Sequence, residues 1–138
     1  MTKRLLIVRG LPGAGKSQFI ENMTVDILTK VVCSADDYFM VQGKYCFDAK
    51  ALPQAHQQCK EHAERAMKQG MCLVVIDNTC SRRWEIEPYL TLAQQYGYDI
   101  TEVTVGRLTP EVIGSYFRRN NHGVPEETIR KMVEQWEF

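Results

Sequence analysis

The segment from Gly10 to Ser17 constrains the fold of this chain more than any other feature of its sequence. It reads Gly-Leu-Pro-Gly-Ala-Gly-Lys-Ser and fits the pattern G-x-x-x-x-G-K-[ST]. A run of branched apolar residues (5–8) precedes it, and a stretch with apolar residues at helical spacing (16–28) follows it. A glycine-rich turn between a buried strand and a helix is the setting of a phosphate-binding P-loop. There the backbone N–H groups and the positive end of the helix form a cradle for phosphates.

The P-loop pattern predicts a role for each polar side chain that it contains. We expect Lys16 to reach the β and γ phosphates of a nucleoside triphosphate, and the Ser17 hydroxyl to coordinate Mg²⁺. The cofactors expected are therefore ATP, or another nucleoside triphosphate, and Mg²⁺. The expected nucleotide-binding residues are Gly10, Leu11, Pro12, Gly13, Ala14, Gly15, Lys16, Ser17 and Gln18.

Strands and helices alternate along the whole chain. Apolar runs predict strands at residues 5–8, 31–34, 72–76 and 100–105. Helical spacing predicts helices at residues 16–28, 51–69 and 83–96, the last restarted or kinked at Pro88. Two more helices begin at Thr109-Pro110, with the threonine as the cap, and at Val124-Pro125. This alternation indicates an α/β fold, with a parallel sheet covered by helices.

Length and composition limit the possible classes of protein. The 138 residues suffice for a single domain, 1–138, and the hydrophobic (44%) and charged (25%) fractions are those of a globular protein. Lys+Arg and Asp+Glu are both 17, so a strongly basic surface for long nucleic acids is not expected. Five cysteines without a CxxC pair, and no signal peptide, favour reduced thiols in the cytoplasm. No apolar run is long enough to cross a bilayer, and the oligomeric state stays open.

Carboxylates follow two of the predicted strands. Asp36 and Asp37 come just after residues 31–34, and Asp77 ends the apolar run at 72–76. The carboxyl ends of parallel strands face the ligand crevice, so these groups should lie on the same edge as the P-loop. Asp36 or Asp37 could accept the proton of an attacking hydroxyl, and Asp77 could hold the metal through water. The alternative is that these aspartates only form turns.

Arg118 and Arg119 end the helix that begins at Pro110. One of them could close over the phosphates as part of a lid at about residues 107–124 and stabilise developing charge. The alternative is that both only favour the helix dipole and solvent. We expect the aromatic residues, such as Trp84, Tyr89 and Trp136, to belong to the core instead of forming stacking surfaces.

Seven segments in this order (GLPGAGKS, SADDYF, GKYCFD, AHQQC, VIDNT, WEIEPY and RNNHGVP) make the chain resemble the polynucleotide-kinase-like P-loop proteins. The resemblance covers nearly the whole chain. It extends to the P-loop domain of the ubiquitin-ligase-binding members and, more distantly, to toxin kinases. It implies that Asp36 is the general base for a 5′-hydroxyl, that Asp77 is the strand-end aspartate, and that Arg118 and Arg119 are the lid arginines.

Two positions depart from the pattern of these relatives. Cys80 stands where they commonly have Asn, so a polar contact is expected to be missing there. Gln18 replaces the usual small hydroxyl residue after the P-loop serine.

Together these observations predict a three-layer P-loop NTPase fold with about four parallel strands in the order 2-3-1-4. The function expected is ATP-dependent phosphoryl transfer to a hydroxyl acceptor, the 5′-hydroxyl of a polynucleotide. Two alternatives stay open. One is a kinase acting on a nucleoside or a sugar, and the other is an ATP-binding or ATPase module that acts through a protein partner.

Overall fold

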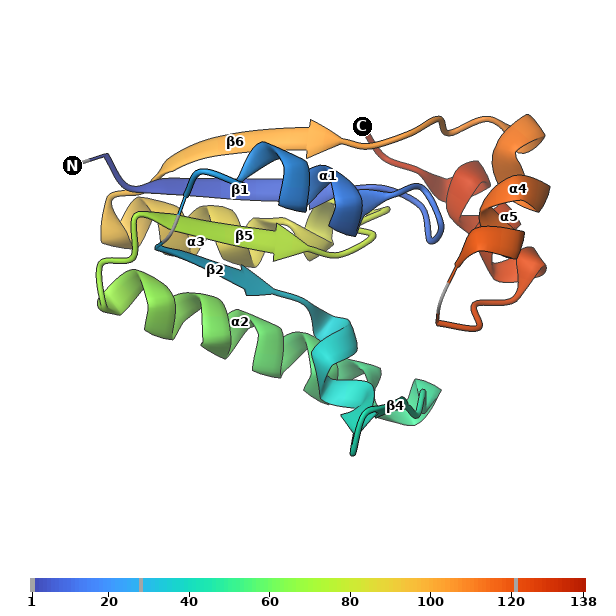
Figure 1. Cartoon of the computed structure of the whole chain (residues 1–138), viewed down its shortest axis with the longest axis horizontal. Helices are drawn as coiled ribbons and strands as arrows, with labels where there is room; N and C mark the ends of the chain where they lie inside the picture. Colours follow the sequence, from blue (N-terminus) through green and yellow to red (C-terminus); the bar gives the residue numbers. More distant parts are fainter. Residues whose placement is uncertain (1, 28, 121) are drawn as a thin grey trace.

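A four-stranded parallel sheet forms the centre of the molecule. The computed structural model describes residues 2–27, 29–120 and 122–138. The strands are β1 (Arg4–Arg9), β2 (Lys30–Cys33), β5 (Leu73–Asp77) and β6 (Asp99–Thr104). They pair in the order β2-β5-β1-β6, which confirms the predicted order 2-3-1-4 (Figure 1).

The register of the sheet brings the carboxyl ends of the central strands to one edge. Val8 on β1 lies beside Asp77 on β5, and Cys33 on β2 lies beside Ile76. The P-loop, the residues after Cys33 and the residues after Asp77 therefore all leave the sheet at the same edge. This common edge is what the parallel alternation predicted.

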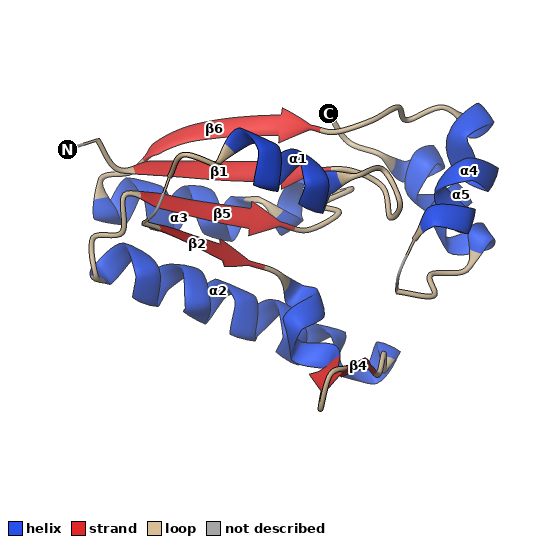
Figure 2. Cartoon of the chain, viewed as in Figure 1, coloured by secondary structure: helices blue, strands red, loops and turns tan. Residues whose placement is uncertain are grey.

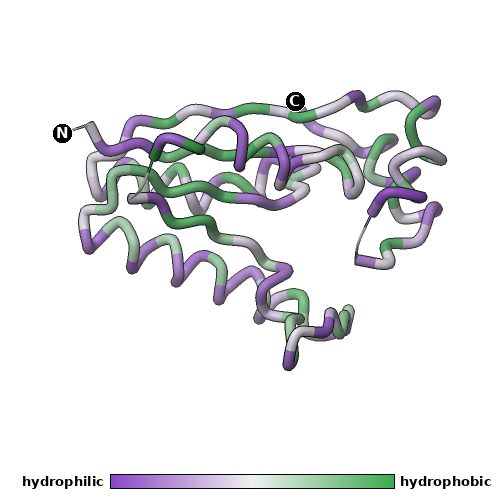
Figure 3. The backbone as a smooth tube through the Cα atoms, viewed as in Figure 1, coloured by the Kyte–Doolittle hydropathy of each residue, from purple (hydrophilic) through white to green (hydrophobic). Residues whose placement is uncertain are grey.

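Helices cover both faces of the sheet, as Figure 2 shows. The helix α1 (Lys16–Met23) lies on one face, and α2 (Leu52–Lys68) and α3 (Glu87–Tyr96) lie on the other. Alternate residues of the strands point to opposite faces of the sheet. Leu5, Ile7, Val74 and Ile76 pack with the buried residues of α2 and α3. Leu6, Val8, Leu73 and Val75 pack with Ile20 of α1. Figure 3 shows the hydrophobic residues concentrated on the central strands.

The helix predicted for residues 16–28 is shorter than expected. It ends at Met23, where the Thr24 hydroxyl donates a 2.6 Å hydrogen bond to the carbonyl of Ile20. The ammonium of Lys30 in turn donates to the Thr24 hydroxyl at 2.6 Å. These contacts turn the chain toward β2, and Leu28 lies outside the described residues.

Short elements that the pattern did not predict follow β2. A 3₁₀ helix, η1 (Ala35–Phe39), leads into a hairpin of β3 (Met40–Val41) and β4 (Lys44–Tyr45), and η2 (Ala49–Ala51) enters α2. The helix predicted for 83–96 is divided into η3 (Arg83–Glu85) and α3, and Pro88 lies in the first turn of α3. This confirms the restart expected at the proline.

Two helices at the C-terminal side cover the end of the P-loop. They are α4 (Ile113–Arg119), preceded by η4 (Pro110–Val112), and α5 (Glu126–Gln135). Thr109 occupies the cap position, but its side chain makes no capping hydrogen bond, so the predicted threonine cap is wrong in that respect. Ile113, Tyr116, Ile129 and Trp136 bury Leu11 of the P-loop. None of the helices in the described part of the chain is both long and apolar enough to span a bilayer.

Candidate functional site

The P-loop connects β1 directly to α1. Gly13 and Gly15 have φ angles of 82° and 98°, a left-handed conformation that glycine adopts without strain. The backbone N–H of Ala14 donates to the carbonyl of Leu11 at 3.0 Å, and that of Phe19 donates to Gly15 at 3.0 Å. The loop therefore has the tight turn and the open helix start that a phosphate cradle requires.

Lys16 lies across its own loop in this structure. Its ammonium donates to the carbonyl oxygens of Gly10 at 2.9 Å and Leu11 at 3.2 Å. Burial lowers the pKa of Lys16, and the nearby carboxylates of Asp77 and Asp36 oppose that shift only partly. A partly buried cation at this position is poised to interact strongly with an anion that enters the cradle.

Ser17 and Asp77 place two oxygen atoms that could serve as metal ligands beside Lys16. The Ser17 hydroxyl donates to Oδ2 of Asp77 at 3.3 Å. Burial raises the pKa of Asp77, although the Lys16 charge and the Ser17 hydrogen bond lower it. A cavity of about 300 Å³ adjoins the pair, lined by Ser17, Ile20, Glu21, Lys30, Val32 and Asp77. Gln18, next in the chain, donates instead to Asn22 at 3.0 Å along the exposed side of α1.

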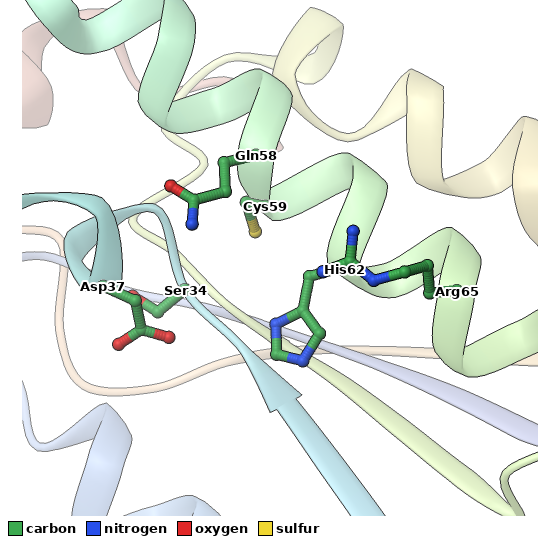
Figure 4. Close-up of a pocket in the computed structure, with 6 residues that line it drawn as sticks. All are labelled: Ser34, Asp37, Gln58, Cys59, His62 and Arg65. Atoms are coloured by element: carbon green, nitrogen blue, oxygen red, sulfur yellow. The ribbon is translucent and has the colours of Figure 1, made fainter.

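The two neighbouring aspartates of η1 have different surroundings. Asp36 accepts a hydrogen bond from the hydroxyl of Tyr45 at 2.9 Å, and its charge acts on Lys16. Asp37 lines a separate cavity of about 250 Å³ with Ser34, Gln58, Cys59, His62 and Arg65. Figure 4 shows Asp37 and Ser34 on one side of that cavity and the residues of α2 on the other. Of these two aspartates, Asp36 is the one whose charge acts on the P-loop lysine.

Asn78 holds η1 against the end of β5. Its side-chain oxygen accepts a 2.9 Å hydrogen bond from the backbone N–H of Ala35, and its amide donates to the Cys59 sulfur at 3.5 Å. The residue before Asp36 is thereby fixed to the residue after Asp77. Cys80, the position where relatives commonly have Asn, is buried and has a φ of 50°, and burial raises its pKa to about 12.

The two candidate lid arginines lie at the end of α4 and are exposed. The guanidinium of Arg119 lies 5.1 Å from the ring centre of Tyr116. Neither Arg118 nor Arg119 forms an ion pair within the described part of the chain. Asn121, within the expected lid, lies outside the described residues.

The structure adds residues that the sequence patterns did not single out. His122 lies with Nδ1 3.3 Å from Oδ2 of Asp36, and Tyr45 reaches the same carboxylate from the hairpin. The expectation that the aromatic residues are core is wrong for Trp84, which is 65% exposed, and for Phe47, which is 54% exposed. It holds for Tyr89 and Trp136, which are buried. No local pattern indicates which aromatic residues face the site, because the hairpin itself has no strong strand signal.

Known proteins share this combination of fold and P-loop. The sequence model of the AAA domain family (AAA_33) matches residues 5–138. Human NEDD4-binding protein 2 is 36% identical over 136 residues, which is 96% of this chain but 8% of that protein. The chain thus corresponds to a small part of that relative.

Two solved structures show the fold at lower sequence identity. A chain of the Pnkp1/Rnl/Hen1 RNA repair complex superimposes with a TM-score of 0.73 and 20% identity, over 97% of this chain and 44% of that one. A sugar kinase from Janibacter sp. superimposes with a TM-score of 0.65 and 18% identity, over 99% and 79%. By its match over residues 5–138, this chain belongs to the AAA_33 family of AAA domains.

Proposed function

We propose that this chain transfers the γ-phosphoryl group of ATP to a hydroxyl group, and that the acceptor is the 5′-hydroxyl of a polynucleotide. The observation that carries the proposal is the position of Asp36. This carboxylate lies at the same sheet edge as Lys16 and Asp77, and its charge acts on the Lys16 ammonium. A carboxylate at the same edge as the phosphate-binding lysine is where a kinase needs its base.

The residues beside the P-loop suit a Mg²⁺ ion bound with ATP. The Ser17 hydroxyl and the Asp77 carboxylate are oxygen donors 3.3 Å apart, and Mg²⁺ is typically held by one or two protein oxygens together with phosphates and water. When bound, the ion neutralises charge on the phosphates. Burial raises the pKa of Asp77, and a cation next to this poorly hydrated carboxylate would stabilise its charge.

The chemical step follows from these positions. Asp36 accepts the proton of the acceptor hydroxyl while its oxygen forms a bond to the γ phosphorus. The bond from the γ phosphorus to the bridging oxygen breaks, and ADP leaves. Lys16 moves from the Gly10 and Leu11 carbonyls to the phosphate oxygens, and Arg118 or Arg119 closes the lid of residues 107–124 over them.

The comparisons support a kinase. They also leave two alternatives to test, a small-molecule acceptor and a module that acts through a protein partner. The similarity to a chain of an RNA repair complex favours a polynucleotide end, and the similarity to a sugar kinase favours a small-molecule hydroxyl. The match to NEDD4-binding protein 2 favours a nucleotide-binding module that acts through a protein partner.

The test is transfer of labelled γ-phosphate from ATP, with Mg²⁺, to 5′-hydroxyl DNA and RNA oligomers, nucleosides and sugars. We expect label on oligomer ends. Asp36→Asn should lower the rate by about 10² or more without weakening ATP binding. Asp37→Asn, which changes the neighbouring carboxylate in the other cavity, is the matched control and should keep the rate.

Each of the other possible results would change one part of the proposed function. Label only on a small molecule would change the acceptor and retain the mechanism. Tight ATP binding with no label on any acceptor would favour the partner-binding module. Unchanged turnover in Asp36→Asn would remove Asp36 from the chemical step.

A further inference from the structure

Aromatic rings from two distant segments meet beside Asp36. Tyr45 on β4 lies nearly parallel to Phe47, with ring centres 6.4 Å apart and an angle of 15°. The imidazole of His122, which follows α4, lies with its centre 4.5 Å from that of Tyr45. The buried ring of Phe39 packs against both, with its centre 6.0 Å from that of Tyr45 and 5.1 Å from that of Phe47.

Both oxygens of the Asp36 carboxylate are engaged by this cluster. The Tyr45 hydroxyl donates to Oδ1 at 2.9 Å, and Nδ1 of His122 lies 3.3 Å from Oδ2. Burial and the Asp36 charge raise the pKa of Tyr45, so its hydroxyl stays protonated and remains a donor. A carboxylate that acts as a base needs a lone pair that the acceptor hydroxyl can reach. His122 blocks one approach to the Asp36 carboxylate.

The position of His122 indicates what kind of acceptor can replace it. It places a flat, nitrogen-bearing ring against Tyr45 and a polar hydrogen-bonding atom against Asp36. A nucleoside carries a flat base and a primary hydroxyl in one group, whereas a sugar lacks the flat ring. The exposed lysines Lys44 and Lys50 flank this segment of the chain. Aromatic rings with nearby cations are the combination that binds single-stranded nucleic acids.

We propose that Tyr45 and Phe47 form the stacking surface for the terminal base of a single-stranded 5′-hydroxyl polynucleotide, and that His122 covers this surface until the acceptor displaces it. This inference rests on the proposed function and names its acceptor site. Phe47 and Tyr45 determine specificity by contacting the base. His122 acts as a gate, because it must move away from Asp36 when the acceptor enters.

The experiment measures binding without chemistry. Two fluorescent 5′-hydroxyl oligonucleotides, identical except that one lacks its 5′-terminal base, are titrated in the presence of ADP, and the Kd is read from anisotropy. Phe47→Leu removes a ring that is more than half exposed and leaves the hydrogen bond between Tyr45 and Asp36 in place, so the fold should persist. It should raise the Kd for the complete oligonucleotide about 5- to 100-fold and leave the abasic one unchanged.

Two further variants separate the parts of the proposal. Trp84→Leu removes a ring that is more exposed than Phe47, elsewhere on the surface, and should change neither Kd. His122→Ala should lower the Kd for the complete oligonucleotide severalfold, because its competitor is gone. Equal losses for both oligonucleotides in Phe47→Leu, or no binding to the unaltered chain, would overturn the stacking surface. Weaker binding in His122→Ala would overturn the gate.

Failure of this inference and failure of the proposed function are distinguishable. Phosphoryl transfer to oligonucleotide ends, together with binding that ignores the terminal base, would leave the function standing and remove the stacking surface. Binding that depends on the base, without any transfer, would retain the surface and reject the kinase reaction.

Discussion

The carbonyl oxygen of Tyr116 lies directly against Gly13, so close that a Cβ atom at position 13 would come within 2.1 Å of it. The P-loop is thus packed against the backbone of α4, the helix that carries the candidate lid arginines. The Tyr116 hydroxyl also accepts a 2.9 Å hydrogen bond from the backbone N–H of Arg107, at the beginning of the same segment. Residues 107–119 are therefore packed against the phosphate-binding loop at the Tyr116 carbonyl, and the Tyr116 hydroxyl holds the beginning of the same segment to α4.

Gly13→Ala should distort this contact. Besides the cost of a left-handed alanine, about 1–2 kcal/mol, the new methyl group must displace the backbone of α4. We expect the free energy of unfolding to fall at least about 1 kcal/mol further than in Gly97→Ala. Gly97 has a similar φ of 74° but open space around it. Gly97→Ala therefore measures the cost of the left-handed backbone alone. Denaturant titration measures both, and equal losses in the two variants would contradict the contact.

Replacing Lys16 should reveal the cost of burying its charge. Because the pKa of Lys16 is lowered in the folded chain, the unfolded chain binds more protons between that pKa and the ordinary value of 10.5, and stability rises with pH there. The unaltered chain should therefore gain stability relative to Lys16→Met between about pH 7 and about pH 10. Denaturant titration at the two pH values measures the difference, and a relative loss at high pH would argue against the buried ammonium.

The same variant has a second expected effect, on the nucleotide. Loss of the charged hydrogen bonds to phosphate should weaken ATP binding by about tenfold or more. The shift of the melting temperature by ATP should shrink accordingly. Undiminished stabilisation by ATP would mean that Lys16 stays on the Gly10 and Leu11 carbonyls when nucleotide binds.

Arg9, the residue before the P-loop, should be a major determinant of stability. It is 1% exposed and donates to the carbonyl of Cys80 at 2.9 Å, to Glu102 at 3.2 Å and to the carbonyl of Glu137. Its guanidinium also stacks on Trp136 at 4.7 Å. Arg9→Met removes the donor to the Cys80 and Glu137 carbonyls and leaves Glu102 paired with Arg83, and we expect a loss of about 3 kcal/mol.

An exposed arginine provides the control for Arg9→Met. Arg130 pairs with Glu126 at 3.6 Å on the surface of α5, and Arg130→Met should change stability by about 0.5 kcal/mol or less. Thermal or denaturant unfolding compares the two. Similar effects would show that the Arg9 network contributes no more than a surface ion pair.

Asn78→Ala should affect both stability and catalysis. It leaves the N–H of Ala35 without its acceptor, at a cost of about 1–2 kcal/mol, and frees η1 to shift. Because Asp36 follows Ala35, we expect phosphoryl transfer to slow by about tenfold or more while ATP binding persists. Asn22→Ala, on the exposed side of α1, should leave the rate unchanged. A normal rate in Asn78→Ala would mean that Asp36 is positioned without this bond.

The elements that local patterns specify were predictable. The apolar runs around Ile7 and Val75 can be buried only as central strands, and the glycines at 13 and 15 permit the turn that follows β1. Because parallel strands end at one edge, the meeting of Ser17 with Asp77 also followed from strand order. Helix α1 was predicted too long, because its end depends on Lys30 reaching back to Thr24 from the next strand.

The sequence by itself therefore determined the P-loop, the order of strands and helices, and the edge at which the polar residues gather. The tertiary structure alone decided that the charge of Asp36 acts on Lys16 while Asp37 lines another cavity. It also decided that Tyr45 and His122 meet on one carboxylate. The physical reason is the distance along the chain over which each kind of interaction acts. Periodicity and turn chemistry act over a few neighbouring residues, whereas these contacts depend on how a hairpin and a helix end, far apart in the chain, pack around the sheet.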